Sequence, residues 1–158
     1  MKKRGFTFVE LLVVFIIIGV LSGMLLLTTL SGRDKAMATR IISDMRTLKS
    51  AALMYYHEEG KKWPIGPVSE AFCSKYLDRK APESGDENLW YGFDSSDQTP
   101  CLVVANLPSE SFGLRKKLAS MASEAGIFED KSLTRIYGET SPPPQRVYMP
   151  VAPKSPSP

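Results

Sequence analysis

The sequence predicts an α+β protein in which one long N-terminal helix carries a small antiparallel β-sheet domain. A stretch of twenty residues without any charge, Leu11 to Leu30, is followed directly by an amphipathic helical pattern that continues to about residue 59. After Gly60, short runs of β-branched and aromatic residues alternate with turn residues, which is typical of paired strands. The 158 residues suffice for one modest domain with an extended element, so a second full domain is not expected.

The composition is that of a globular protein, with 43% hydrophobic and 23% charged residues, which excludes a collagen-like or wholly disordered chain. The net charge is +3, but three of the 20 basic residues lie within the first five positions. The remaining basic residues balance the 17 acidic ones. No strongly basic surface is therefore expected, and nucleic acid is not an expected partner.

The uncharged stretch is long enough to cross a membrane. Twenty residues at about 1.5 Å per residue span the hydrocarbon core of a bilayer, which is about 30 Å thick. Lys2, Lys3 and Arg4 before the stretch favour a cytoplasmic N-terminus and an extracytoplasmic remainder. A cleavable signal peptide is the simpler alternative, but its apolar region usually has about 7 to 15 residues. The nearest Ala-x-Ala site, Ala36 to Ala38, also lies beyond the end of the stretch.

Glu10 distinguishes this segment from a plain membrane anchor. A carboxylate beside Leu11 enters the edge of the bilayer at an insertion cost of about 2 to 3 kcal/mol, and such groups usually face a partner. The apolar segment contains no cation that could pair with this carboxylate. An amino terminus is the remaining group that could supply one.

Residues 2–10, Lys-Lys-Arg-Gly-Phe-Thr-Phe-Val-Glu, run straight into the apolar stretch. This arrangement closely resembles the N-terminal signature of type IV prepilins and of the pseudopilins of type II secretion. The resemblance implies a pilin-like fold, cleavage by a prepilin peptidase between Gly5 and Phe6, and N-methylation of Phe6. It also implies that Glu10 pairs with such an amino group on a neighbouring subunit, which would set the axial register of a filament.

The helix is expected to continue from the membrane segment to about Glu59, where Gly60 and Trp63-Pro64 end it. If unbroken, it is about 80 Å long. The apolar stripe of its second half has alternating spacings of three and four and consists of Ala38, Ile41, Met45, Leu48, Ala52 and Tyr55. The chain is thus expected to comprise a leader (1–5), a transmembrane or filament-core helix (6–30), an amphipathic half of the same helix (31–59), a small extracytoplasmic α+β domain (60–139) and a Pro-rich, solvated tail (140–158).

Within the domain, Ser69 is expected to cap a short helix over 70–79. Strands over 88–94 and 101–107 are expected to pair as a hairpin. A further helix is expected from Ser109 to the glycine at 126, and a third strand at either 133–137 or 146–149.

Cys73 and Cys101 are the only two cysteines. An even number in an extracytoplasmic domain favours a disulfide, which would contribute about 3 to 4 kcal/mol by closing its loop. The alternative is two buried thiols.

No motif for catalysis, metal binding or a cofactor is present, so the chain is not expected to be an enzyme. His57 lies among acidic residues at the end of the long helix, where a solvated helix terminus is the expected state. The acidic clusters at 86–88 and 94–97 lack EF-hand spacing and are expected to be solvated turns.

The resemblance implies a structural subunit of a type IV pilus-like filament, assembled as a homo-oligomer through the N-terminal helix. Its expected partners are a prepilin peptidase, an assembly ATPase, an inner-membrane platform protein and the membrane itself. Its expected location is the inner membrane before assembly, and then a surface pilus or a periplasmic pseudopilus. The alternatives are a pseudopilin of type II secretion, a minor tip subunit that binds a surface or DNA, and a membrane-tethered enzyme or sensor, for which no catalytic residues are found.

Overall fold

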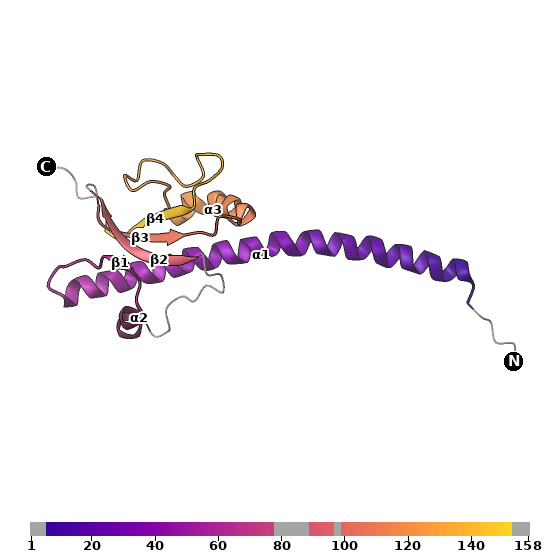
Figure 1. Cartoon of the computed structure of the whole chain (residues 1–158), viewed down its shortest axis with the longest axis horizontal. Helices are drawn as coiled ribbons and strands as arrows, with labels where there is room; N and C mark the ends of the chain where they lie inside the picture. Colours follow the sequence, from indigo (N-terminus) through magenta and orange to yellow (C-terminus); the bar gives the residue numbers. More distant parts are fainter. Residues whose placement is uncertain (1–5, 78–88, 97–98, 153–158) are drawn as a thin grey trace.

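The computed structural model describes residues 6–77, 89–96 and 99–152, with the side chains of 26–31 and 99 left out. Figure 1 shows a small domain on one half of a long helix, whose other half extends away from the domain. The α+β fold expected from the sequence is confirmed: an N-terminal apolar helix and a small antiparallel sheet.

The long helix, α1, runs from Phe8 to Glu58 over 51 residues. Thr7 is its N-cap, and the Glu59 backbone N–H closes its last turn by donating to the Tyr55 carbonyl oxygen. Figure 1 shows one continuous, gently curved helix. The expected apolar stripe is buried against the domain up to its last member: Ala38, Ile41, Met45, Leu48 and Ala52 are all 0% exposed, and Tyr55 is half-buried.

The sheet has four antiparallel strands in the order β1-β2-β3-β4. The expected hairpin is the centre of this sheet, with Trp90 opposite Asn106 and Phe93 opposite Val103. The two-residue strand β1 at the sheet edge was not expected from the sequence. The strands are β1 (Gly66–Pro67), β2 (Trp90–Ser96), β3 (Thr99–Asn106) and β4 (Arg146–Pro150).

Two shorter helices flank α1. Helix α2 (Glu70–Tyr76) begins as expected, because the Ser69 side chain accepts a hydrogen bond from the Phe72 backbone N–H. Helix α3 (Phe112–Ala125) begins at Ser111 and not at Ser109. It ends at Gly126, which has the left-handed conformation expected of a C-terminal glycine, with φ 67°.

The core lies between the sheet, α1 and α3. The inward side chains of β3 alternate with outward ones, so Cys101, Val103 and Ala105 face α1. On the outer face, a smaller apolar cluster packs beneath Leu133 and contains Leu102, Val104 and Tyr148.

The prediction of a Pro-rich, solvated tail is wrong for residues 140–152. Of the two candidate third strands, 146–149 is the strand, and Ile136 in the other makes only an isolated bridge to Phe128. Residues 140–145 are held against α3, because Arg115 donates a hydrogen bond of 2.7 Å to the Pro143 carbonyl oxygen. Tyr137 donates another of 2.7 Å to the Pro144 carbonyl oxygen. Composition alone misses such anchors, because a proline carbonyl remains a full acceptor.

Candidate functional site

The N-terminal end of α1 contains the residues expected to be processed and to direct assembly. Phe6, the first described residue, is 80% exposed. Gly5 lies outside the described residues, so cleavage between Gly5 and Phe6 stays a prediction.

Glu10 forms a capping box with Thr7. Its Oε2 accepts hydrogen bonds from the Thr7 backbone N–H at 2.8 Å and from the Thr7 hydroxyl at 2.7 Å. The Thr7 hydroxyl oxygen accepts in return from the Glu10 backbone N–H at 3.4 Å. Two of these bonds satisfy backbone N–H groups, those of Thr7 and Glu10, that a helix start leaves without intrahelical partners.

Thr7 is the functional candidate that reading the sequence for charges missed. The signal was present, because Thr-x-x-Glu before an apolar run is the capping-box pattern. Both donors contact Oε2, and among the described residues Oε1 of Glu10 accepts no hydrogen bond. One carboxylate oxygen therefore remains available to a second donor.

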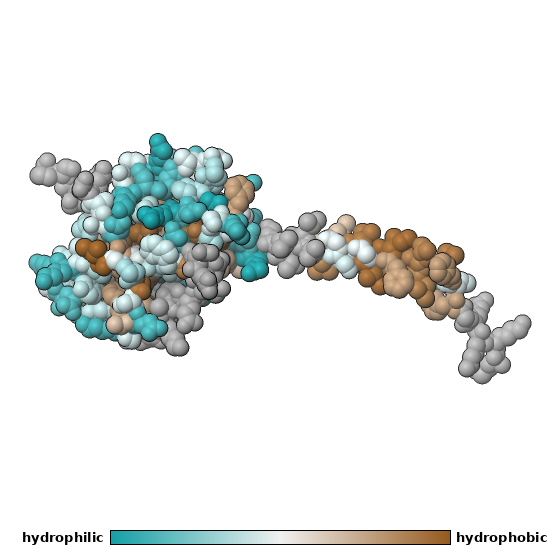
Figure 2. All heavy atoms as spheres, in the orientation of Figure 1, coloured by the Kyte–Doolittle hydropathy of each residue, from teal (hydrophilic) through white to brown (hydrophobic). Residues whose placement is uncertain are grey.

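The helix beyond Glu10 exposes an uninterrupted apolar surface. Residues 8–25 form one span long and apolar enough to cross a membrane, and none of that span is buried inside the structure. Figure 2 shows this span, residues 8–25, which we call the stem, in brown, in contrast to the largely hydrophilic domain. A hollow of about 310 Å³ opens on its side between Phe8, Leu11, Leu12, Phe15 and Ile16. Such a surface must be covered by lipid or by other helices.

Two carboxylates of α1 connect the stem to the domain. Asp44 is 3% exposed; its Oδ2 accepts a hydrogen bond of 3.2 Å from the Tyr91 hydroxyl and lies 3.9 Å from Nε of Arg40. Asp34 lies where α1 enters the domain, with its carboxylate packed against Gly113 in the first turn of α3. A Cβ atom at position 113 would collide with Oδ2 of Asp34. The glycine thus permits a close approach of the two helices.

The far end of α1 carries an ion-pair cluster. Lys75 of α2 lies 3.2 Å from Glu58 and 3.4 Å from Glu59, and the Tyr76 hydroxyl donates to Glu58 at 3.1 Å. Hydrogen bonds from Lys75 and Tyr76 hold the pKa of Glu58 below its usual value. His57 is exposed here beside Tyr56, as expected of a solvated helix end. Within the described ranges, no group of three metal-ligating side chains exists.

Cys73 and Cys101 are both 0% exposed and belong to the same core cluster. They are thiols in this structure. Burial raises the pKa of the Cys101 thiol to about 12, so it is a weak nucleophile at neutral pH. The disulfide between them stays a prediction.

Comparison with known proteins places these features in a family. Residues 1–26 match the family described as the prokaryotic N-terminal methylation motif. The type II secretion system core protein G of Dickeya chrysanthemi is 35% identical over 119 residues, which are 75% of this chain and 69% of that protein. The proteins of the same name from Klebsiella michiganensis and Escherichia coli K12 are 38% and 39% identical over 54 residues, 34% of this chain. No solved structure matches the chain significantly.

The shorter alignments cover 38% and 37% of those two relatives. The Dickeya alignment covers 119 residues, more than the 51 residues of α1, so the likeness extends into the domain. The prepilin-type signature expected from the first ten residues is confirmed. By its N-terminal motif and by the extent of this likeness, the chain belongs to the family of the type II secretion system core protein G, the pseudopilins.

Proposed function

We propose that this chain is a structural subunit of a type II secretion pseudopilus, processed between Gly5 and Phe6 and assembled through α1. The observation that carries the proposal is the likeness to core protein G across 75% of the chain. Among the possibilities that the resemblance left open, this likeness favours a pseudopilus over a surface pilus or a tip-binding subunit.

Before assembly, the stem would cross the inner membrane, with Lys2, Lys3 and Arg4 on the cytoplasmic side and the domain in the periplasm. The exposed apolar surface of the stem supports this arrangement, because lipid would cover it. The prepilin peptidase would then remove residues 1–5 and methylate the amino group of Phe6. An assembly ATPase and an inner-membrane platform protein would drive extraction into the filament.

In the filament, the stems of neighbouring copies would replace lipid around α1. The hollow beside Phe15 suits an apolar side chain of a neighbouring helix. Glu10 would pair through Oε1 with the amino terminus of a neighbouring Phe6, while Oε2 keeps its bonds to Thr7. A carboxylate buried without this partner is strongly unfavourable, so misregistered packing would be penalised.

Substitutions at position 10 separate capping from charge. Glutamine also accepts at the third position of a capping box, so Glu10→Gln keeps the helix start and removes the negative charge. Glu10→Ala removes both. We expect cleavage to proceed in both variants and filament assembly to fail in both. Normal filaments from Glu10→Gln would overturn the pairing with an amino terminus.

Cleavage is tested by intact-mass measurement and N-terminal sequencing of the membrane-bound and sheared fractions. We expect a chain that begins at methylated Phe6, and a Gly5→Val variant that keeps the leader because its side chain blocks the peptidase cleft. A chain that retains residues 1–5, or that is cut near Ala38, would overturn the proposal.

A further inference from the structure

The end of the domain nearest the stem combines an exposed aromatic residue with exposed cations. Phe112, the first residue of α3, is 52% exposed, although it is large and apolar. Lys116 lies one turn further along α3 and is exposed. Arg33 and Lys35 on α1 are exposed too, and Glu110, two residues before Phe112, is an exposed acid. Figure 1 shows α3 at the end of the domain from which the stem emerges, and Figure 2 shows a brown patch among hydrophilic atoms there.

The contact between Asp34 and Gly113 sets the height of this surface above a bilayer. Asp34 is four residues beyond Leu30, the last residue of the uncharged stretch, so it lies about 6 Å further along the helix. The headgroup layer is about 5 to 7 Å deep on each side of the hydrocarbon core. Because Gly113 touches Asp34, the first turn of α3 lies at the depth of the headgroups whenever the stem spans a membrane.

We propose that this end of the domain is a lipid-binding surface, with Phe112 in the interfacial layer and Arg33, Lys35 and Lys116 at anionic phosphates. Aromatic residues and cations are the side chains that favour this layer. Among the described residues, this surface has three exposed cations for one exposed acid. The domain would therefore rest on the membrane in one orientation until the subunit is extracted. The inference rests on the proposed membrane stage of the function.

Site-specific labels test the depth of this surface. The full chain is reconstituted into vesicles of phosphatidylethanolamine with 30% phosphatidylglycerol, as Phe112→Cys, Ile65→Cys and Phe15→Cys variants carrying a fluorescent maleimide. The native cysteines are fully buried, so the unsubstituted chain serves as the labelling control. Ile65 is the matched control, because it is an apolar residue 75% exposed just beyond the other end of α1.

We expect a nitroxide on the lipid headgroup to quench the label at 112 at least threefold more than the label at 65. Equal quenching at the two positions would overturn the inference. A nitroxide within the acyl chain should quench the label at 15. If it does not, the stem is not inserted and the proposed function fails as well. If 15 is quenched and 112 is not, only the lipid-binding surface is refuted.

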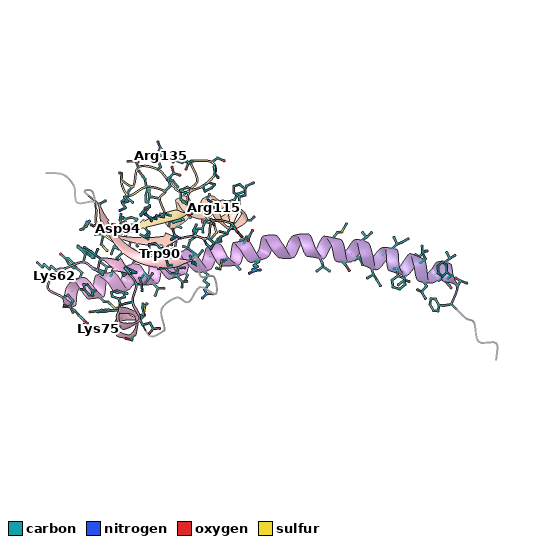
Figure 3. All side chains as sticks on the ribbon, viewed as in Figure 1. Lys62, Lys75, Trp90, Asp94, Arg115 and Arg135 are labelled. Carbon is teal, nitrogen blue, oxygen red and sulfur yellow. The ribbon has the colours of Figure 1, made fainter. Side chains whose placement is uncertain are left out.

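Charge variants test the anionic component. Lys116→Glu should reduce quenching at 112 in vesicles with phosphatidylglycerol and leave it unchanged in vesicles of phosphatidylcholine. Lys62→Glu is the matched control, because Figure 3 places Lys62 at the opposite end of the domain from α3. An equal effect of both substitutions would refute a local lipid contact. Quenching of the label at 112 that disappears on dilution to one chain per vesicle would show that it depends on a contact between copies. That result would overturn the proposal.

Discussion

The contact between Asp34 and Gly113 allows a quantitative test of how the domain is held on the stem. The Ser111 side chain makes no capping hydrogen bond, and the first turn of α3 has no acidic residue. Asp34 of α1 therefore supplies a carboxylate that lies beside the first turn of α3. An anion beside a helix N-terminus typically contributes about 0.3 to 1 kcal/mol to the free energy of unfolding.

We expect the effect of Gly113→Ala to depend on residue 34. Alanine in a helix is favoured over glycine by up to about 1 kcal/mol. In the native chain, the new methyl group displaces the Asp34 carboxylate, so the gain and the loss nearly cancel. In an Asp34→Ala background there is no carboxylate to displace, so Gly113→Ala should stabilise by about 1 kcal/mol. That corresponds to roughly 4 °C in melting temperature.

The assay is thermal and chemical unfolding of the four full-length chains of this cycle in detergent, followed by tryptophan fluorescence, which reports on Trp63 and Trp90 of the domain. Asp34→Asn is the control for charge, because it keeps the volume of the side chain. In that background Gly113→Ala should again give less than its full gain, since the amide group still has to move. The same stabilisation by Gly113→Ala in the native and the Asp34→Ala chains would refute the reasoning.

Three further predictions concern the domain. Gly138→Ala should destabilise the full chain by about 2 kcal/mol or more, because φ is 97° there and a Cβ would collide with Ala119; an unchanged denaturation midpoint would contradict this. Burial raises the pKa of Asp94, but hydrogen bonds outweigh this effect, the one from Lys131 most of all, and hold the pKa below its usual value. Asp94→Asn should therefore lower the free energy of unfolding by under about 1 kcal/mol above pH 4. The native and the variant chain should converge in stability as the pH falls further, and a pH-independent difference would contradict this. Cys101 should resist alkylation at pH 8 in the folded chain and react after unfolding, which mass spectrometry would detect, whereas rapid native labelling would contradict its burial.

Features governed by near neighbours could be read from the sequence. The C-terminal end of α1 was expected within one residue, because a following glycine acts on adjacent backbone groups. The hairpin was expected for the same reason, since alternating strands around a turn pair locally. Glu10 stood out because a charge next to an apolar stretch is costly wherever that stretch is buried.

Other expectations failed because the deciding contact was distant in sequence. The region after 140 has the composition of a tail, but Arg115 is 28 residues from the Pro143 carbonyl that it binds. Helix α3 begins two residues later than expected. Its N-cap, Ser111, makes no side-chain capping bond, and the carboxylate of Asp34 on α1 lies beside its first turn instead.

The sequence alone was enough to predict the stem, its need for a membrane or a helix bundle around it, and the importance of Glu10, because apolar length and a charge beside it are local properties. The tertiary structure decided how the domain sits on that stem. Asp44 meets Tyr91 across 47 residues of chain, and Asp34 meets Gly113 across 79. Such contacts depend on which helix faces pack together, and the free energy of packing is a property of the whole core.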